Sequence, residues 1–236
     1  MIMALSPCQR YRRRVQAELA LKNHEALSAS PASLHLQLRE LDSDVTRVRS
    51  LGTIADRVDM KRDELLPKWL PTVERYLDSG TVHDHPAFAW CVIWLFDVGN
   101  FDQALDWADI AIEQGQSTPE NIKSTFATFV ADTVMVWAET QASLGHSIEP
   151  YFSRTFANIR DKWRLHEEVN AKWYKFAGLL LLSDKSGKPL ATAIDDVETL
   201  LQADALLVQA GAFDPKVGVK THREKIAARI RALQKV

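Results

Sequence analysis

The side chains whose types and spacing could support hydrolytic chemistry are carboxylates that cluster at two places in the sequence. The clusters are Asp102, Asp106 and Asp109, and Asp195, Asp196 and Glu198. A nuclease that uses two metal ions needs carboxylates that converge on one point. Both clusters instead fall in the first turns of predicted amphipathic helices, where the helix macrodipole favours acids. Asp195 and Asp196 are adjacent, so they project about 100° apart on a helix, which suits capping better than a shared metal. We therefore predict no catalytic residue.

Three other side chains, His83, His85 and Cys91, are of types that bind metals. Their spacing lacks the paired motifs of structural zinc sites, and Cys91 falls on a helix that is expected to be buried. Histidines in a turn before Pro86 are the simpler interpretation. The chain also lacks a phosphate loop, a G-x-S-x-G and an H-E-x-x-H. We predict no bound metal and no cofactor.

Basic residues gather at the two ends of the chain, although the formal net charge of the whole is only −2. Residues 1–62 contain eleven Lys and Arg against seven Asp and Glu, and four of these arginines flank Tyr11. Such a cluster is an electrostatic footprint for phosphate, although a solvated helix end would look the same. The residues predicted to bind DNA are Arg10, Arg12, Arg13 and Arg14, with Lys220, Arg223, Arg229 and Arg231 as a secondary surface.

An apolar seam follows the first basic cluster. Its spacing alternates between four and three residues, with a phase slip near Gly52, as in a coiled coil. The seam predicts self-association through Leu34, Leu38, Leu41, Val45, Val48 and Leu51, and continues to Val58. Its partner could be the first helix, folded back as an antiparallel hairpin, or the same helix in another subunit.

The middle of the chain is organised around a predicted helical hairpin. Residues 87–98 are almost all apolar, which indicates a helix buried on most of its circumference. Gly99 and Asn100 end it, and an amphipathic helix follows. This pattern is typical of a tetratricopeptide-like pair, and residues 173–207 repeat it loosely. The expected fold is therefore all-α, with a basic helical or coiled-coil arm followed by a body of α-hairpins.

The segment around Pro67 and Pro71 is expected to be a rigid connector, with Trp69 docked on the core. It separates three predicted regions: a basic arm at 1–62, an α-hairpin body at 63–210 and a basic C-terminal helix at 211–236. Two cysteines in unrelated contexts fit a reducing cytoplasm. No apolar run reaches transmembrane length and no leader is recognised, so we expect no membrane partner and a protein that stays inside the cell.

Several of these segments, in this order, resemble the small terminase subunit of temperate contractile-tailed phages, the GpM-like family often labelled the terminase endonuclease subunit. The segments are SPCQRYRRRVQAE, ELLPKWLPTVERYLDSG, WLFDVGNFDQALDWADIAIEQG, and KFAGLLLL followed by ATAIDDVETLLQADAL. The resemblance covers nearly the whole chain.

The resemblance implies a DNA-recognition subunit of a genome-packaging motor in the cytoplasm of a bacterial host. Its partners would be double-stranded phage DNA, the terminase large subunit and further copies of itself, in a ring-like homo-oligomer. The large subunit of such motors carries the ATPase and usually the nuclease. The main alternative is a helical-repeat adaptor that binds a protein peptide and no DNA. Salt dependence separates the two, because phosphate contacts weaken steeply with salt.

Overall fold

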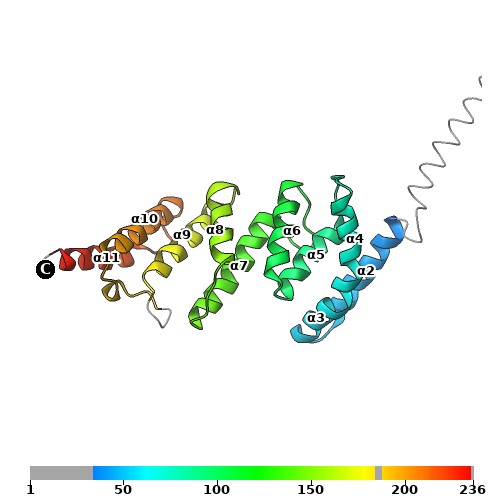
Figure 1. The fold of residues 1–236 in the computed structure, drawn as a ribbon, viewed down its shortest axis with the longest axis horizontal. Coiled ribbons are helices and arrows are strands. Elements are labelled where there is room, and N and C mark those ends of the chain that lie inside the picture. Colours follow the sequence, from blue (N-terminus) through cyan, green and yellow to red (C-terminus); the bar gives the residue numbers. More distant parts are fainter. Residues whose placement is uncertain (1–33, 184–187, 235–236) are drawn as a thin grey trace, which may run out of the picture. The chain divides into compact units, whose positions relative to one another are not determined.

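The structure, a computed structural model, describes residues 34–183 and 188–234, and throughout these residues the secondary structure is helical, without a strand (Figure 1). The all-α prediction is confirmed. The chain divides into two compact units, residues 1–80 and 81–236. The arginines at positions 10, 12, 13 and 14 lie outside the described residues.

The first unit contains two helical segments separated by a short break. Its elements are α2 (Leu34–Ser50), α3 (Ile54–Met60), the π-helical turn η1 (Lys61–Leu65) and α4 (Leu66–Asp78). The seam was expected to continue to Val58 with a phase slip near Gly52, and the helix breaks at that point: α2 ends at Ser50 and Thr53 caps α3. The Thr53 hydroxyl accepts a hydrogen bond from the Asp56 N–H at 3.1 Å. An N-cap of this kind fixes the start of a new helix and so breaks the seam.

The segment predicted to be a connector is instead helical from residue 54 to residue 78. Met60, Leu65 and Leu66 all have helical dihedrals, and the Leu66 N–H bonds to the Lys61 carbonyl five residues back. A proline ring inside an α-helix clashes with the carbonyl four residues earlier. The wider π turn immediately before Pro67 loosens that spacing, so the helix passes through the proline. The expected boundary after Arg62 therefore lies inside a helix, and the chain divides after Gly80.

The apolar seam is largely covered in the single chain. Leu41, Val45 and Val48 are buried, while Leu38 and Leu51 are half-buried. Leu34 begins α2. Self-association through this seam stays a prediction. Packing inside the chain already accounts for the three central residues of the seam.

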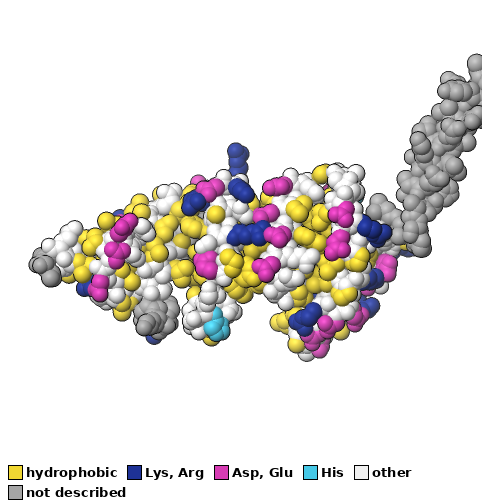
Figure 2. Space-filling view, in the orientation of Figure 1, with side chains coloured by type: hydrophobic (Ala, Val, Ile, Leu, Met, Phe, Trp, Pro, Cys, Tyr) yellow, Lys and Arg dark blue, Asp and Glu magenta, His cyan; other side chains and the backbone are white. Residues whose placement is uncertain are grey.

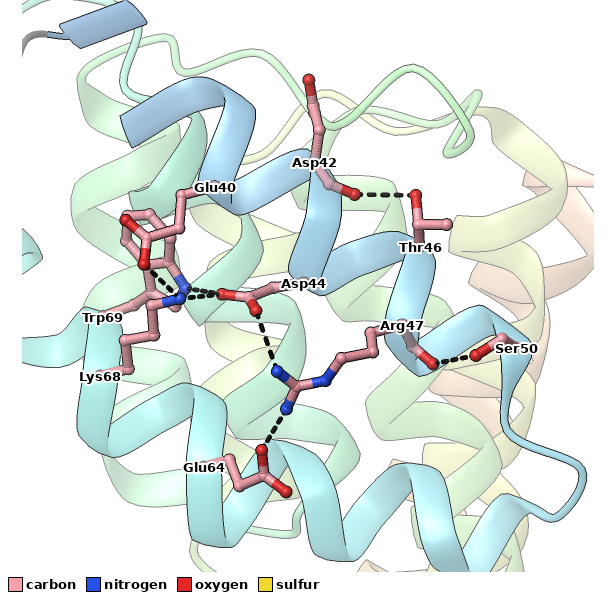
Figure 3. Close-up of polar contacts among 9 residues, drawn as sticks. All are labelled: Glu40, Asp42, Asp44, Thr46, Arg47, Ser50, Glu64, Lys68 and Trp69. Carbon is pink, nitrogen blue, oxygen red and sulfur yellow. Dashed lines mark hydrogen bonds and ion pairs between the residues drawn. The ribbon is translucent and has the colours of Figure 1, made fainter. Parts of the chain in front are cut away.

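A buried carboxylate joins α2 to α4 in this unit (Figure 3). Asp44 is only 4% exposed, and its Oδ2 accepts hydrogen bonds from Lys68 Nζ at 2.6 Å and from Trp69 Nε1 at 3.0 Å. Its Oδ1 lies 3.6 Å from Arg47 Nη1. A buried charge is stable only when it is paired and hydrogen-bonded. These contacts fix α2 along α4, and they place Trp69 in the core as expected.

Two further acids extend this network. Glu40 pairs with Lys68 at 2.7 Å, and Glu64 of η1 pairs with Arg47. Burial alone lowers the pKa of Lys68, but hydrogen bonds and the charges of Asp44 and Glu40 outweigh it and leave the pKa raised. Lys68 therefore stays charged and holds α4 against α2.

The second unit begins with the predicted hairpin. It is formed by α5 (Pro86–Asp97) and α6 (Phe101–Glu113). Gly99 has a φ of 79°, a conformation that ends helices readily, and Asn100 caps α6 by accepting the Gln103 N–H. Asp102 lies in the first turn of α6, as expected. The predicted hairpin is confirmed; a tetratricopeptide-like packing of the hairpins stays a prediction.

The rest of this unit is a succession of helices in chain order. They are α7 (Phe126–Ser143), α8 (Tyr151–Asp161), α9 (Glu167–Leu181), the 3-10 turn η2 (Ala191–Ala193), α10 (Val197–Phe213) and α11 (Lys220–Leu233). Trp173 of α9 is 1% exposed and stacks on Phe152, with ring centroids 5.2 Å apart. Trp173 is thus part of the core of this unit.

The helices α9 and α10 pack closely and carry α11 with them (Figure 1, yellow to red). A Cβ added at Gly178 of α9 would lie 3.0 Å from the Ala203 carbonyl oxygen and from Leu207 Cγ. Ile226 of α11 is 1% exposed and joins the same apolar cluster. The described part of the C-terminal basic segment is thus anchored in the core of this unit.

The first prediction concerns the buried carboxylate. Asp44→Ala should lower the free energy of unfolding by about 2–3 kcal/mol, because it leaves the Trp69 N–H without its acceptor and Lys68 with Glu40 alone. Asp42→Ala is the matched control: it removes an exposed carboxylate from the same helix and should change stability by less than about 0.5 kcal/mol. Urea unfolding followed by circular dichroism measures both. Equal losses would mean that Asp44 contributes no more than a surface acid.

The second prediction concerns the contact between α9 and α10. Gly178→Ala should destabilise the protein by about 1–2 kcal/mol, since the new methyl group meets a backbone oxygen that cannot move aside. The same substitution at Gly211 of α10 meets only Val219 Cγ2 at an ordinary 3.4 Å. It should therefore be neutral or stabilising by up to about 1 kcal/mol through helix propensity. Thermal unfolding of the two variants should give shifts of opposite sign, and a stabilised Gly178→Ala would contradict the close packing.

Candidate nucleic-acid interface

The predicted secondary DNA-binding surface lies on α11, which begins after a left-handed Gly218 (φ 77°). One face of this helix buries Ile226, and Ile230 and Leu233 pack beside it. The basic C-terminal segment thus contains a helix, as predicted. Because the apolar face is turned inward, most of the basic side chains are left toward solvent.

Two of the four predicted side chains are held by acids of the same unit. Arg223 Nε lies 2.8 Å from Asp204 Oδ1 of α10. Arg229 is 22% exposed; it pairs with Asp195 and donates from Nε to the Ile194 carbonyl at 2.9 Å. These contacts tie α11 to the helix and loop before it. The spacing of these residues in the sequence does not predict either ion pair.

The other two, Lys220 and Arg231, are exposed, and neither forms an ion pair within the described part of the chain. The start of α11 has no acid in its first turn, and its N-cap, Val219, offers no side-chain acceptor. Burial first, and then the charges of Lys175 and Lys225, lower the pKa of His222 in that turn. The beginning of α11 therefore gathers the positive charges of Lys220, Lys175 and Lys225, which favour an anionic ligand.

The acids of α6 are occupied by α8. Arg154 donates to Asp106 Oδ1 and to Asp109 Oδ2, each at 2.7 Å, and Asn158 Nδ2 donates to Asp109 Oδ1 at 3.0 Å. Figure 2 shows basic and acidic side chains side by side where α6 and α8 face the viewer. Asp106 and Asp109 thus join two helices, which differs from the expected solvated helix start.

The second acidic cluster also has structural partners. Asp196 is the N-cap of α10 and accepts from the Thr199 N–H at 2.8 Å and the Glu198 N–H at 3.3 Å. The Thr199 hydroxyl and these N–H groups lower the pKa of Asp196. The capping interpretation is confirmed for Asp196, and Asp195 is directed to Arg229 instead of to a site shared with its neighbour.

The histidines before α5 have a similar explanation. His85 caps α5, since its Nδ1 accepts the Phe88 N–H at 3.0 Å. Burial, followed by the nearby charge of His83, lowers the pKa of His85, which favours the neutral form that can accept this bond. Cys91 is fully buried, and burial raises the pKa of its thiol. In residues 34–183 and 188–234, no three His, Cys, Asp or Glu side chains come together in a way that could hold a metal ion.

The helices that the structure describes include none that is both long and apolar enough to cross a membrane. The candidate interface that can be placed is thus the basic face of α11, with Lys220 and Arg231 open and Arg223 and Arg229 paired. A basic surface of this kind can bind phosphates without any reactive group.

Comparison with known proteins bears on what such a surface would bind. The family model for the phage small terminase subunit matches residues 38–168. The probable terminase endonuclease subunit of Haemophilus phage HP1 (strain HP1c1) is 46% identical over 195 residues, which cover 83% of this chain and 69% of that protein. The terminase endonuclease subunit of Escherichia phage P2 is 25% identical over 221 residues, 94% of this chain and 84% of that protein. No solved structure matches the chain. The match over more than half of the chain, together with the likeness to the HP1 protein, shows that the chain belongs to the phage small terminase subunit family.

Proposed function

We propose that this chain is the DNA-recognition subunit of a phage packaging terminase. It binds the packaging site on double-stranded viral DNA in the host cytoplasm, assembles with copies of itself and recruits the terminase large subunit. Membership of the small terminase subunit family is the observation that carries this proposal. Both relatives are named as terminase endonuclease subunits, which supports a function on DNA for this chain.

The distribution of charge along the chain supports binding through the ends. Residues 76–153 contain eleven Asp and Glu and a single Lys or Arg, Lys123. Residues 214–236 contain seven Lys and Arg against two acids, and residues 1–62 are also net basic. A phosphate backbone is repelled by the acidic middle and attracted to the two ends. DNA therefore binds mainly through the N-terminal arginines, and α11 is a secondary surface.

The third prediction tests this order of importance. Replacing Arg10, Arg12, Arg13 and Arg14 together with Ala should weaken binding to packaging-site DNA. It should also flatten the slope of log affinity against log salt by about one unit for each phosphate that the protein no longer neutralises. Fluorescence anisotropy at several salt concentrations gives both quantities. An unchanged affinity and slope would exclude these arginines as the main DNA-binding group.

Two pairs of substitutions on α11 serve as matched controls, because they remove the same charge from the same helix. Lys220→Ala with Arg231→Ala removes side chains that are free of ion pairs in the described structure, and should lower the salt slope. Arg223→Ala with Arg229→Ala removes side chains already held by Asp204 and Asp195, and should lower it less. A larger effect from the paired arginines would mean that DNA displaces these acids.

An adaptor that binds a peptide and no DNA is the competing function. A groove of that kind binds largely through apolar contacts, so its affinity changes little with salt. The same titrations separate the two functions. If the wild-type protein binds no DNA at any salt concentration, the adaptor function is favoured.

The fourth prediction is that the isolated protein does not cut DNA when Mg²⁺ or Mn²⁺ is supplied. The acids that could share a metal have structural partners: Asp195 pairs with Arg229, Asp196 caps α10, and Asp109 bonds to Arg154. In the proposed complex the large subunit performs the cleavage. Incubation with a packaging-site plasmid and scoring of nicks tests this. Metal-dependent nicking that disappears in Asp195→Asn or Asp196→Asn would assign the nuclease to this chain.

A further inference from the structure

An apolar stripe runs along the solvent side of α10. Leu201 is 55% exposed and Val208 is 44% exposed, and Ala205 and Ala212 between and beyond them are exposed as well. Their spacing of four, three and four residues places all of them on one face of the helix. The opposite face is the one that packs on α9 and α11, through Ala203, Leu207 and Ala210 among others. The exposed stripe is therefore not the core face of the helix.

The stripe has one free charge at its end. Glu198, in the first turn of α10, is exposed and lies on the same face, three residues before Leu201. Between Thr199 and Phe213 the only charged residue is Asp204, which is tied to Arg223, and the polar residues beside the stripe are the exposed, neutral Gln202 and Gln209. A second copy packed antiparallel sets the two Glu198 side chains at opposite ends of the joint, so the two copies meet no repulsion.

The order of large and small side chains makes the stripe complementary to itself. Along α10 it alternates Leu201, Ala205, Val208 and Ala212. In an antiparallel pair of two copies, one register sets Leu201 opposite Ala212 of the other copy, and Val208 opposite Ala205. Each large side chain then meets a small one, which is how well-packed helix interfaces interdigitate. A parallel pair would instead set Leu201 against Leu201 and leave the alanines facing each other.

We infer that α10 is a self-association surface, in which a second copy of this chain packs antiparallel through Leu201, Ala205, Val208 and Ala212. The inference rests on the multimer of the proposed function and names a surface that pairs two of its copies. The seam first predicted on α2 has its central residues covered by packing within the chain, so another surface is needed. Because α11 packs on α10, this joint also places the basic helices of both copies next to it.

The test compares two double variants that exchange exposed apolar residues for acids. Leu201→Glu with Val208→Glu should reduce the mass in solution, measured by light scattering, to half of the wild-type value or less. Val136→Glu with Leu144→Glu is the matched control, since these side chains are 64% and 62% exposed at another place in the same unit. The control should keep the wild-type mass. A folded Leu201→Glu, Val208→Glu protein with unchanged mass would overturn the inference, and so would a monomeric wild type.

A cross-linking experiment keeps the inference testable even if the acidic variant fails to fold. Ala205→Cys and Val208→Cys are each made in a Cys8→Ser background, where the remaining Cys91 is buried. The antiparallel register predicts that a mixture of the two proteins forms a disulfide-linked pair at least tenfold faster than either protein alone. Cross-linking of Ala205→Cys with itself at the same rate as in the mixture, or no cross-linking at all, would contradict it.

Failure of this inference differs from failure of the proposed function. If the wild-type protein binds packaging-site DNA with the expected salt slope but the α10 variants do not change its mass, only the surface is wrong. If the α10 variants and cross-links behave as expected but the wild type binds no DNA, the surface stands and the proposed function does not.

Discussion

The need to surround α5 with protein on nearly every side is the constraint on which the second unit depends. Nine of its twelve residues are buried, so a single neighbouring helix cannot cover it. The α6 helix contributes Trp107 against Phe88, and Phe129 of α7 meets Phe96. Each of these helices then has an apolar face of its own to bury, which the next helix covers in turn. The order of helices in this unit follows from that requirement.

The distribution of charge along the chain does not follow the division into packed units. Residues 63–213 contain 22 Asp and Glu against 11 Lys and Arg, so the helical body is acidic. Some of those acids are tied to basic side chains of other helices, as Asp109 is to Arg154 and Asp204 is to Arg223. The acidic body limits where a polyanion can approach, and the ends of the chain remain for it. The charge pattern thus limits where a polyanion can approach, while the apolar pattern determines the fold.

Periodicity was a good guide where a helix has one clear partner. The hairpin of α5 and α6, the amphipathic α11 and the cap at Asp196 were predictable because local spacing alone decides them. The α2 seam left its partner open, since an apolar stripe has the same spacing whether a second subunit or its own chain covers it. The pairs of Arg223 with Asp204 and Arg229 with Asp195 were also beyond prediction, because residues far apart in sequence meet only through the packing of α10 and α11.

The helix through Pro67 was mispredicted for another reason: a proline usually ends a helix, but a preceding π turn can accommodate it. That turn has a geometric consequence. A π turn holds one residue more than an α turn, so it rotates everything after it by about 100° relative to a regular helix. Trp69 and Lys68 face Asp44 in that rotated phase. The length of residues 61–65 therefore acts as an angular spacer: a one-residue deletion that restores regular helix would leave the α4 face toward α2, whereas winding the same five residues as regular helix would turn that face away, without altering a single residue of the contact itself.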